Sequence, residues 1–250
     1  MNAKNIIRIL ILSFFVLVSC KTTQLPSQDM LSISVYETSE MPSLKISFIK
    51  GGHYNHPTFA LWMEDLNGEY LKTLYLTKSY ASGIFGHELV GDSVWKNTSG
   101  PSFQPAALPY WTNKKGLIDG EYLIPTPEHP YLDAYTGATP LTNFQLKTAS
   151  QTISGYKLML EVNQTWDWNK YWTNNKYPES KAYSHSSQPS IIYAVEINDD
   201  QKIYFMNPIG HGNPKGENGK LYTDISTLST AKEIFKTIKI EILENESSAD

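Results

Sequence analysis

The chain has 250 residues, a length that suits one large domain or two small ones. Its aromatic content of 12% and charged content of 18% are those of a globular protein, and they exclude a disordered chain or a coiled coil. The formal net charge of -4 provides no basic footprint for nucleic acid, so we expect no nucleic-acid partner.

The first twenty residues have the features of a bacterial lipoprotein signal. Lys4 and Arg8 form a basic region, and Ile9–Val18 is an apolar run shorter than a membrane-spanning helix requires. The run ends in the sequence LVSC, which resembles a lipobox, the motif at which a signal peptide is cut before a lipidated cysteine. Cys20 is the only cysteine, so no internal disulfide can form, and lipidation accounts for this lone thiol. The alternative is an ordinary secreted protein with a chance cysteine.

We therefore expect residues 1–19 to be a signal peptide and residues 20–30 to be a lipidated tether that holds the protein to the membrane. Lys21 follows Cys20 in place of the Asp that marks retention in the inner membrane. The predicted location is the outer membrane, with the domain facing the periplasm.

Alternating apolar residues predict a mostly β domain, beginning with strands over residues 31–36 and 44–48. Residues 58–76 predict a hairpin around Asn67-Gly68, a dipeptide that tolerates positive φ. Residues 79–120 have no sustained period but contain several aromatic residues, so we expect a long ordered excursion packed over the sheet. A strand is expected to follow over residues 117–124.

The second half continues the β pattern with an alternating strand over residues 156–162. Residues 191–206 predict a second hairpin around Asp199-Asp200, and residues 238–242 predict a last strand. Thr230 and Glu233 fit a capping box, so a short helix is expected to start at Ala231. The prediction is an all-β sandwich with long loop insertions and one short C-terminal helix, in a single domain over residues 31–243 with a polar tail over 244–250.

Residues 133–139, with the sequence DAYTGAT, follow the pattern Asp, two variable residues, Ser or Thr, Gly, Ala, Thr. This pattern resembles the acceptor site for covalent FMN in the flavin-carrying subunits of bacterial redox complexes. The resemblance implies that a flavin transferase moves FMN from FAD onto Thr139 as a phosphoester. Gly137 and Ala138 provide the thin backbone that lets such a hydroxyl reach a Mg²⁺-bound nucleotide. The alternative is a simple turn, since Asp, Thr and Gly are ordinary turn residues.

The other motif residues have candidate roles around the cofactor. Asp133 could hold the loop through an Asx-type bond or act in the transferase complex. The Thr136 hydroxyl and the Gly137 N–H could bond to the phosphate. Tyr135 is a candidate for flavin contact, or else a surface turn tyrosine. Trp166 and Trp168 would share a face in an extended segment and could stack on the flavin ring, or they could cover the end of the sandwich.

Three blocks together are similar to the bacterial family called "domain of unknown function 2271": Pro57–Leu76, Asp133–Thr139 and Gln188–Tyr193. The resemblance implies a secreted protein with an Ig-like β-sandwich and a flavin-acceptor motif, acting in extracytosolic electron transfer. Pro140, directly after the acceptor, departs from the family pattern and fixes the backbone there.

The histidines do not form a metal-binding pattern. His53 and His56 lie three residues apart in a Gly/Pro loop, and a site with His87 would need convergence in space, so we expect solvent-facing loops. The chain has no Gly-x-Ser-x-Gly sequence, so a serine hydrolase has no support. We predict neither catalytic nor metal-binding residues.

The predicted function is that of a lipoprotein carrying FMN on Thr139 and relaying electrons in an envelope redox system. Its expected partners are the flavin transferase and a membrane electron donor or acceptor. We expect an electron-transfer flavoprotein more than a self-contained enzyme, and activity as a reductase stays open. The alternative is a non-redox Ig-like binding or structural lipoprotein that contacts glycan or protein through its aromatic loops.

Overall fold

The computed structural model describes residues 30–36, 43–90, 94–117, 120–121, 123–132, 134–149, 155–198 and 200–243. The predicted signal peptide, Cys20 with nearly all of the tether, Asp133 and the polar tail lie outside the described residues.

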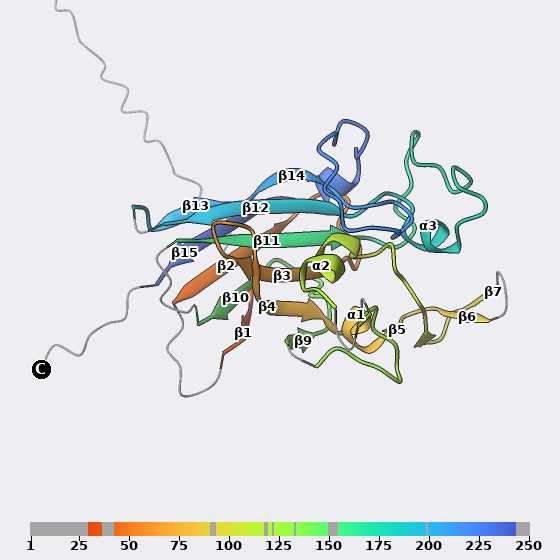
Figure 1. Cartoon of the computed structure of the whole chain (residues 1–250), viewed down its shortest axis with the longest axis horizontal. Helices are drawn as coiled ribbons and strands as arrows, with labels where there is room; N and C mark the ends of the chain where they lie inside the picture. Colours follow the sequence, from red (N-terminus) through yellow and green to blue (C-terminus); the bar gives the residue numbers. More distant parts are fainter. Residues whose placement is uncertain are drawn as a thin grey trace, which may run out of the picture.

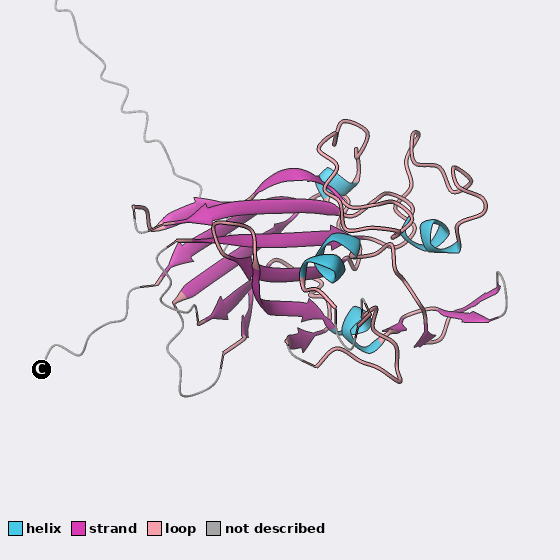
Figure 2. Cartoon of the chain, viewed as in Figure 1, coloured by secondary structure: helices cyan, strands magenta, loops and turns pink. Residues whose placement is uncertain are grey.

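Two sheets form the body of a mostly β, sandwich-like fold (Figures 1 and 2). In spatial order, sheet A contains β1 (Leu31–Ser34), β10 (Phe144–Thr148), β2 (Leu44–Lys50), β15 (Phe235–Ile242) and β13 (Ile203–Phe205). Sheet B contains β14 (Asn207–His211), β12 (Ile191–Ile197), β11 (Tyr156–Asn163), β3 (Thr58–Glu64), β4 (Tyr70–Thr77) and β9 (Tyr135–Gly137). The pairs β1–β10 and β4–β9 are parallel, so both sheets are mixed. The predicted hairpin around Asn67-Gly68 is confirmed as β3–β4.

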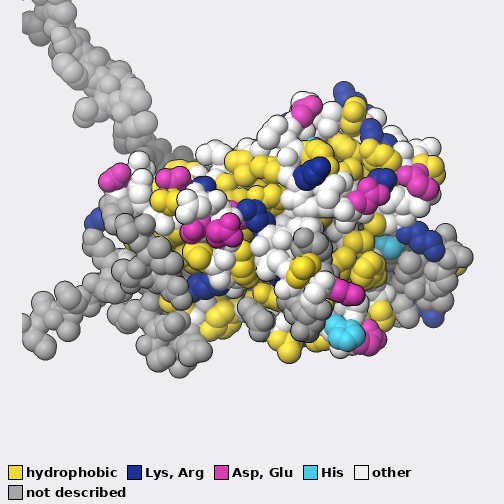
Figure 3. Space-filling model, in the orientation of Figure 1, with side chains coloured by type: hydrophobic (Ala, Val, Ile, Leu, Met, Phe, Trp, Pro, Cys, Tyr) yellow, Lys and Arg dark blue, Asp and Glu magenta, His cyan; other side chains and the backbone are white. Residues whose placement is uncertain are grey.

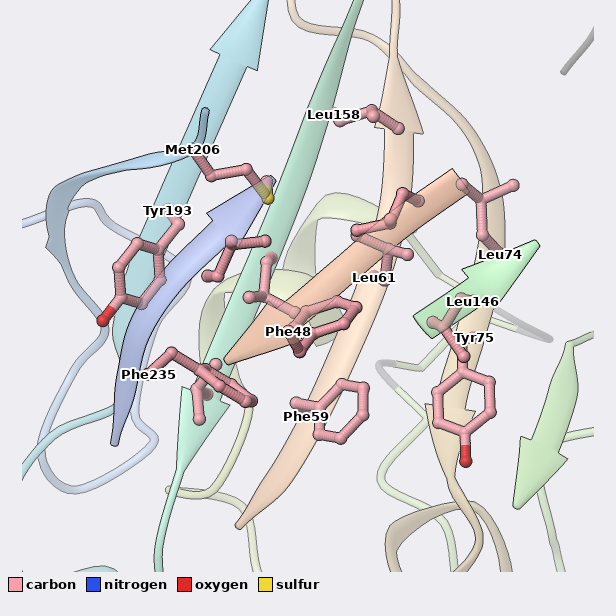
Figure 4. Close-up of a cluster of buried hydrophobic side chains, with 14 of the residues drawn as sticks. Phe48, Phe59, Leu61, Leu74, Tyr75, Leu146, Leu158, Tyr193, Met206 and Phe235 are labelled. Atoms are coloured by element: carbon pink, nitrogen blue, oxygen red, sulfur yellow. The ribbon is translucent and has the colours of Figure 1, made fainter. Parts of the chain in front are cut away.

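The core lies between the two sheets and is rich in aromatic rings (Figure 4). Phe48 of sheet A stacks on Phe144 with ring centroids 4.5 Å apart, and it meets Phe59 of sheet B at 5.9 Å. Because side chains alternate along a strand, Phe59 and Leu61 of β3 face this core together. Burial of these rings is the main driving force for closing one sheet on the other.

Sheet B is buried on both faces, and every one of the seven residues of β3 is buried. Its second face carries Ala60, Trp62 and Met159, which pack in a separate apolar cluster with Trp111. That cluster is formed by the segment between β4 and β9, which includes α1 (Lys78–Ser82) and α2 (Pro109–Lys114). Figure 1 shows α2 lying across β11 and β3. The predicted ordered excursion over the sheet is confirmed as a third layer.

Short elements complete the described chain. Two small antiparallel ribbons, β5–β8 and β6–β7, extend from the third layer. Their strands are β5 (Ile84–Phe85), β6 (Glu88–Val90), β7 (Val94–Lys96) and β8 (Gly100–Pro101), and the remaining helices are α3 (Lys181–Ser186) and the 3-10 turn η1 (Ala231–Glu233). Basic and acidic side chains are interspersed over the described part of the face in Figure 3.

The prediction of a single short helix is wrong. The C-terminal helix starts at Ala231 as expected, but it is a 3-10 turn, and the Thr230 side chain does not cap it. The Thr230 hydroxyl accepts a hydrogen bond from the Gln188 amide instead. Helices α1, α2 and α3 were not predicted, because five or six residues are too few to show a 3.6-residue period.

The second predicted hairpin is also wrong, since β12 lies in sheet B and β13 in sheet A. Both edges of β12 are already paired, with β11 and β14, so β13 crosses over and pairs with β15. Two alternating stretches separated by turn residues give the same sequence pattern whether the strands form a hairpin or cross to different sheets. The predicted strand over residues 117–124 has no counterpart among the elements of the described residues in that range.

Glu161 on β11 fixes the third layer to sheet B. Its side chain is fully buried, with Oε2 accepting the Trp111 N–H at 2.6 Å and Oε1 accepting the Tyr110 N–H at 3.1 Å. The Ser190 hydroxyl donates a third hydrogen bond at 2.5 Å. Tyr110 and Trp111 follow Pro109 in the first turn of α2, where N–H groups have no partner within the helix. The carboxylate therefore satisfies the start of α2 and places negative charge at the positive end of its dipole.

Burial raises the pKa of Glu161 from 4.5 to about 7, against the opposing effect of these three hydrogen bonds. The folded protein consequently binds a proton more tightly than the unfolded chain between these two values. The free energy of unfolding should fall as the pH rises through that window, by an amount on the order of 3 kcal/mol.

We expect Glu161→Gln to remove this pH dependence, because the amide is neutral and keeps the shape of the side chain. The measurement is the free energy of unfolding from urea titrations at several pH values between 4.5 and 8, for the variant and the wild type. Between pH 4.5 and 8 the free energy of unfolding of the wild type should fall by about 3 kcal/mol relative to that of the variant, whatever the offset between the two curves at acidic pH. Parallel curves would contradict a titrating Glu161.

Candidate functional site

The flavin-acceptor pattern lies at an edge of sheet B, where the chain passes to sheet A. Strand β9 pairs in parallel with β4, with Tyr135 opposite Tyr75 and Gly137 opposite Thr77. A parallel neighbour requires a long crossover connection. The third layer supplies that connection, so its path over sheet B brings the motif back beside β4.

Three hydrogen bonds from residues distant in sequence hold the loop around Thr139. The Thr139 hydroxyl donates to the Pro57 carbonyl at 3.0 Å. On either side of it, the Tyr75 hydroxyl donates to the Ala138 carbonyl at 3.4 Å, and the Tyr54 hydroxyl donates to the Pro140 carbonyl at 2.6 Å. The loop is therefore positioned by tertiary contacts and not by its own turn alone.

Both phenols keep their protons at neutral pH. Burial raises the pKa of Tyr75 to about 12, and burial together with the neighbouring Tyr75 raises the pKa of Tyr54 as well. Lys50 extends the contacts, because its Nζ donates to the Leu141 carbonyl at 2.5 Å and lies 4.7 Å from the centre of the Tyr54 ring. This part of the site is a set of donors that bind the backbone around Thr139.

The motif is accessible from outside. Thr136 and Ala138 are exposed, Gly137 and Thr139 are half-buried, and Tyr135 retains 41% of its surface. Ala138, the small exposed neighbour of Thr139, leaves room for another enzyme to dock at this hydroxyl. The exposed Thr136 hydroxyl is three residues from Thr139, but it lies within the strand and not in the loop.

The fold also explains why position 137 is a glycine. A Cβ at this position would lie 2.5 Å from the Tyr75 hydroxyl oxygen, closer than real Cβ atoms approach. Tyr75 cannot swing away easily, because its ring is buried and stacks on Phe59 with centroids 5.3 Å apart. Glycine thus permits β9 to lie against β4, a requirement that the sequence pattern did not reveal.

The residues that hold the loop were missed in the sequence. Tyr54, Pro57 and Tyr75 carry no motif that marks them as neighbours of Thr139. A partial signal existed, since Pro57 and Tyr75 belong to the first of the three blocks that carry the family resemblance. Residues of that block contact the second block through β4–β9 pairing and the Thr139 bond.

The tryptophan pair does not have the expected geometry. Trp166 has a φ of 60°, in the left-handed region, so the segment is not extended and the prediction of a shared face with Trp168 is wrong. Trp168 is 45% exposed, whereas Trp172 is buried in the core at the end of the sandwich.

The histidines are distributed as expected for the exposed loops. His53, His56 and His87 are exposed, and His211 is buried and stacks on Tyr222 with ring centroids 5.2 Å apart. Within the described ranges, His, Cys, Asp and Glu do not form a group of three that could hold a metal. The described part of the chain also contains no helix that is both long and apolar enough to span a membrane.

Comparisons of the chain with protein-family models, with curated proteins and with solved structures found no match. The site is therefore interpreted from its own geometry. Thr139 is half-buried, has a small exposed neighbour and lies in a loop held by three distant residues, and this arrangement fits a phosphoester attachment point.

The contact of Gly137 with Tyr75 can be tested by a double-mutant cycle. Gly137→Ala should lower the free energy of unfolding by about 1–3 kcal/mol, because the added methyl group clashes with the buried phenol. In Tyr75→Phe the clashing oxygen is absent, and the nearest ring atom lies at 3.4 Å, an ordinary contact. The double variant should recover at least about 1 kcal/mol relative to additivity. Additive losses in urea unfolding would show that this contact does not constrain position 137.

Proposed function

We propose that the chain is an extracytosolic lipoprotein that carries FMN as a phosphoester on Thr139 and relays electrons in an envelope redox system. The observation that supports this most directly is that Thr139 is half-buried in a loop whose flanking carbonyls are bound by Tyr54 and Tyr75. The lipobox-like sequence that ends in Cys20 supports an extracytosolic location, and we propose that the lipid on Cys20 anchors the chain in the outer membrane. The proposed partners are a flavin transferase and a membrane electron donor or acceptor.

The attachment reaction transfers a phosphoryl group. The Thr139 oxygen attacks the phosphorus of the FMN half of FAD, the bond between that phosphorus and the AMP oxygen breaks, and AMP leaves. The hydroxyl proton passes to a base of the transferase, whose Mg²⁺ neutralises the developing charge. In the unmodified chain that proton points to the Pro57 carbonyl, so the lone pairs of the oxygen lie on its other side.

The chain supplies attachment and positioning. Bound FMN provides one- and two-electron transfer, while the protein tethers and orients it. Tyr54, Tyr75 and Lys50 bind three carbonyls on both sides of Thr139 and restrict the loop. A covalent link suits a compartment in which lost FMN is not readily replaced.

We also propose that the sandwich is Ig-like and belongs to the "domain of unknown function 2271" family. The support is the order and spacing of the three sequence blocks, together with the contact between the first two. The parallel pairing of β9 with β4 at the edge of sheet B, and the hydrogen bond from Thr139 to Pro57 just before β3, are that contact.

Co-expression with a flavin transferase tests the attachment site. The intact mass of the wild-type chain should increase by one FMN less one water, and Thr139→Ala should abolish the increase because it removes the accepting oxygen. Thr136→Ala is the matched control and should keep the modification, as should Thr139→Ser at a lower rate. An unmodified and colourless wild-type chain beside a working transferase would refute the proposal.

The second candidate function is a non-redox lipoprotein that binds glycan or protein. The observation that favours it is the exposure of two aromatic residues in one loop, Trp168 at 45% and Tyr171 at 51%. Exposed rings of this kind stack on sugars and anchor protein interfaces.

If this second function holds, Trp168→Ala and Tyr171→Ala should each lower retention on an immobilised glycan panel at least about tenfold, as expected for loss of an aromatic anchor. The chain should bind without any flavin attached. Phe205→Ala is the control, since Phe205 is 50% exposed on β13, outside that loop. Unchanged retention in both loop variants would remove the support for this candidate.

A further inference from the structure

Near the end of β11 and the start of β12, four buried side-chain oxygens lack a hydrogen-bond partner within the described chain. They are Asn163 Oδ1, Asp167 Oδ2, Ser186 Oγ and Ser187 Oγ. Buried polar atoms in native proteins are nearly always paired, so each such atom requires an explanation. Asn163, Ser186 and Ser187 are at most 3% exposed, which keeps bulk water from these residues.

The four oxygens belong to two segments that are bonded to each other. Asp167 forms a β-bridge with Ser187, and the Gln188 N–H donates to the Asp167 carbonyl at 3.3 Å. The Asn163 amide donates to the Gln188 carbonyl at 3.0 Å. These contacts bring the end of β11 and the end of α3 together, so the oxygens come from one compact region of the fold.

The backbone around the cluster is strained. Trp166 and Ser187 have φ values of 60° and 63°, in the left-handed region that non-glycine residues seldom adopt. Among the described residues, His56 is the only other non-glycine with positive φ. Strain of this kind persists where the surrounding structure enforces it, and it is frequent at ligand sites.

The chemistry of the cluster is that of an oxygen donor set: one carboxylate, one amide carbonyl and two hydroxyls. Oxygen donors of this type bind hard cations. Within the described residues Asp167 is in no ion pair, so a cation would offset the cost of its burial.

We propose that this cluster binds a hard divalent cation, Ca²⁺ in preference to Mg²⁺. Ca²⁺ accepts six to eight oxygens in a flexible arrangement, as irregular backbone provides, whereas Mg²⁺ demands a near-ideal octahedron. A single carboxylate implies weak binding, with a Kd on the order of 10⁻⁴–10⁻³ M, as in extracellular modules. The proposal does not depend on the flavin.

The test is calorimetric titration and thermal unfolding of the purified full chain after treatment with a chelator. Addition of CaCl₂ to about 10 mM should raise the Tm by about 3–11 °C relative to NaCl of equal ionic strength. Asp167→Asn should abolish the shift, because it removes the charge and keeps the shape. Asp224→Asn is the matched control, at an exposed aspartate whose Oδ1 accepts the Ser226 N–H, and this variant should keep the Tm shift.

Ser187→Gly provides a second arm if Asp167→Asn fails to fold. Glycine adopts positive φ freely, so without Ca²⁺ this variant should have at least the wild-type Tm. It should nevertheless bind Ca²⁺ at least about threefold more weakly, because it lacks the Ser187 hydroxyl. The proposal is overturned if the wild type shows neither heat nor a Tm shift, which would assign the oxygens to ordered water. An unchanged response in Asp167→Asn, or an equal shift with MgCl₂, would also overturn it.

Discussion

The buried carboxylate of Glu161 is the interaction on which the arrangement of this protein depends most. It lies on the face of sheet B that an ordinary two-sheet sandwich would expose to water. By accepting two N–H groups from the first turn of α2, it secures a third layer over Trp62 and Met159. Without that layer, sheet B would present a broad apolar face to solvent.

The third layer also determines where the candidate acceptor motif lies. A parallel neighbour for β4 requires a long connection, and the chain between Lys78 and Ala134 provides it while covering the sheet. The motif returns beside Tyr75, and Thr139 comes within hydrogen-bonding distance of Pro57. The core packing of Tyr75 and the geometry of the proposed attachment site are thus parts of one arrangement.

The elements that were predicted correctly are those with local causes. The β3–β4 hairpin follows from alternating residues around Asn67-Gly68, and both signals lie within the hairpin itself. The β12–β13 segment has similar local signals, but the free edge of β15 decides its pairing. Helix α2 is too short to show a helical period, and it has no local N-terminal signal either, because Glu161, which accepts its first N–H groups, lies 50 residues further along the chain than Trp111.

The sequence by itself determined the mostly β character, the first hairpin and the position of the candidate acceptor, because alternation, turn chemistry and a short motif are written in neighbouring residues. Only the tertiary structure decided which strands share a sheet and why residue 137 must be glycine. It also decided which residues hold Thr139 and which oxygens gather near Ser187. These features depend on contacts between residues that are distant in sequence, and a local pattern carries no information about them.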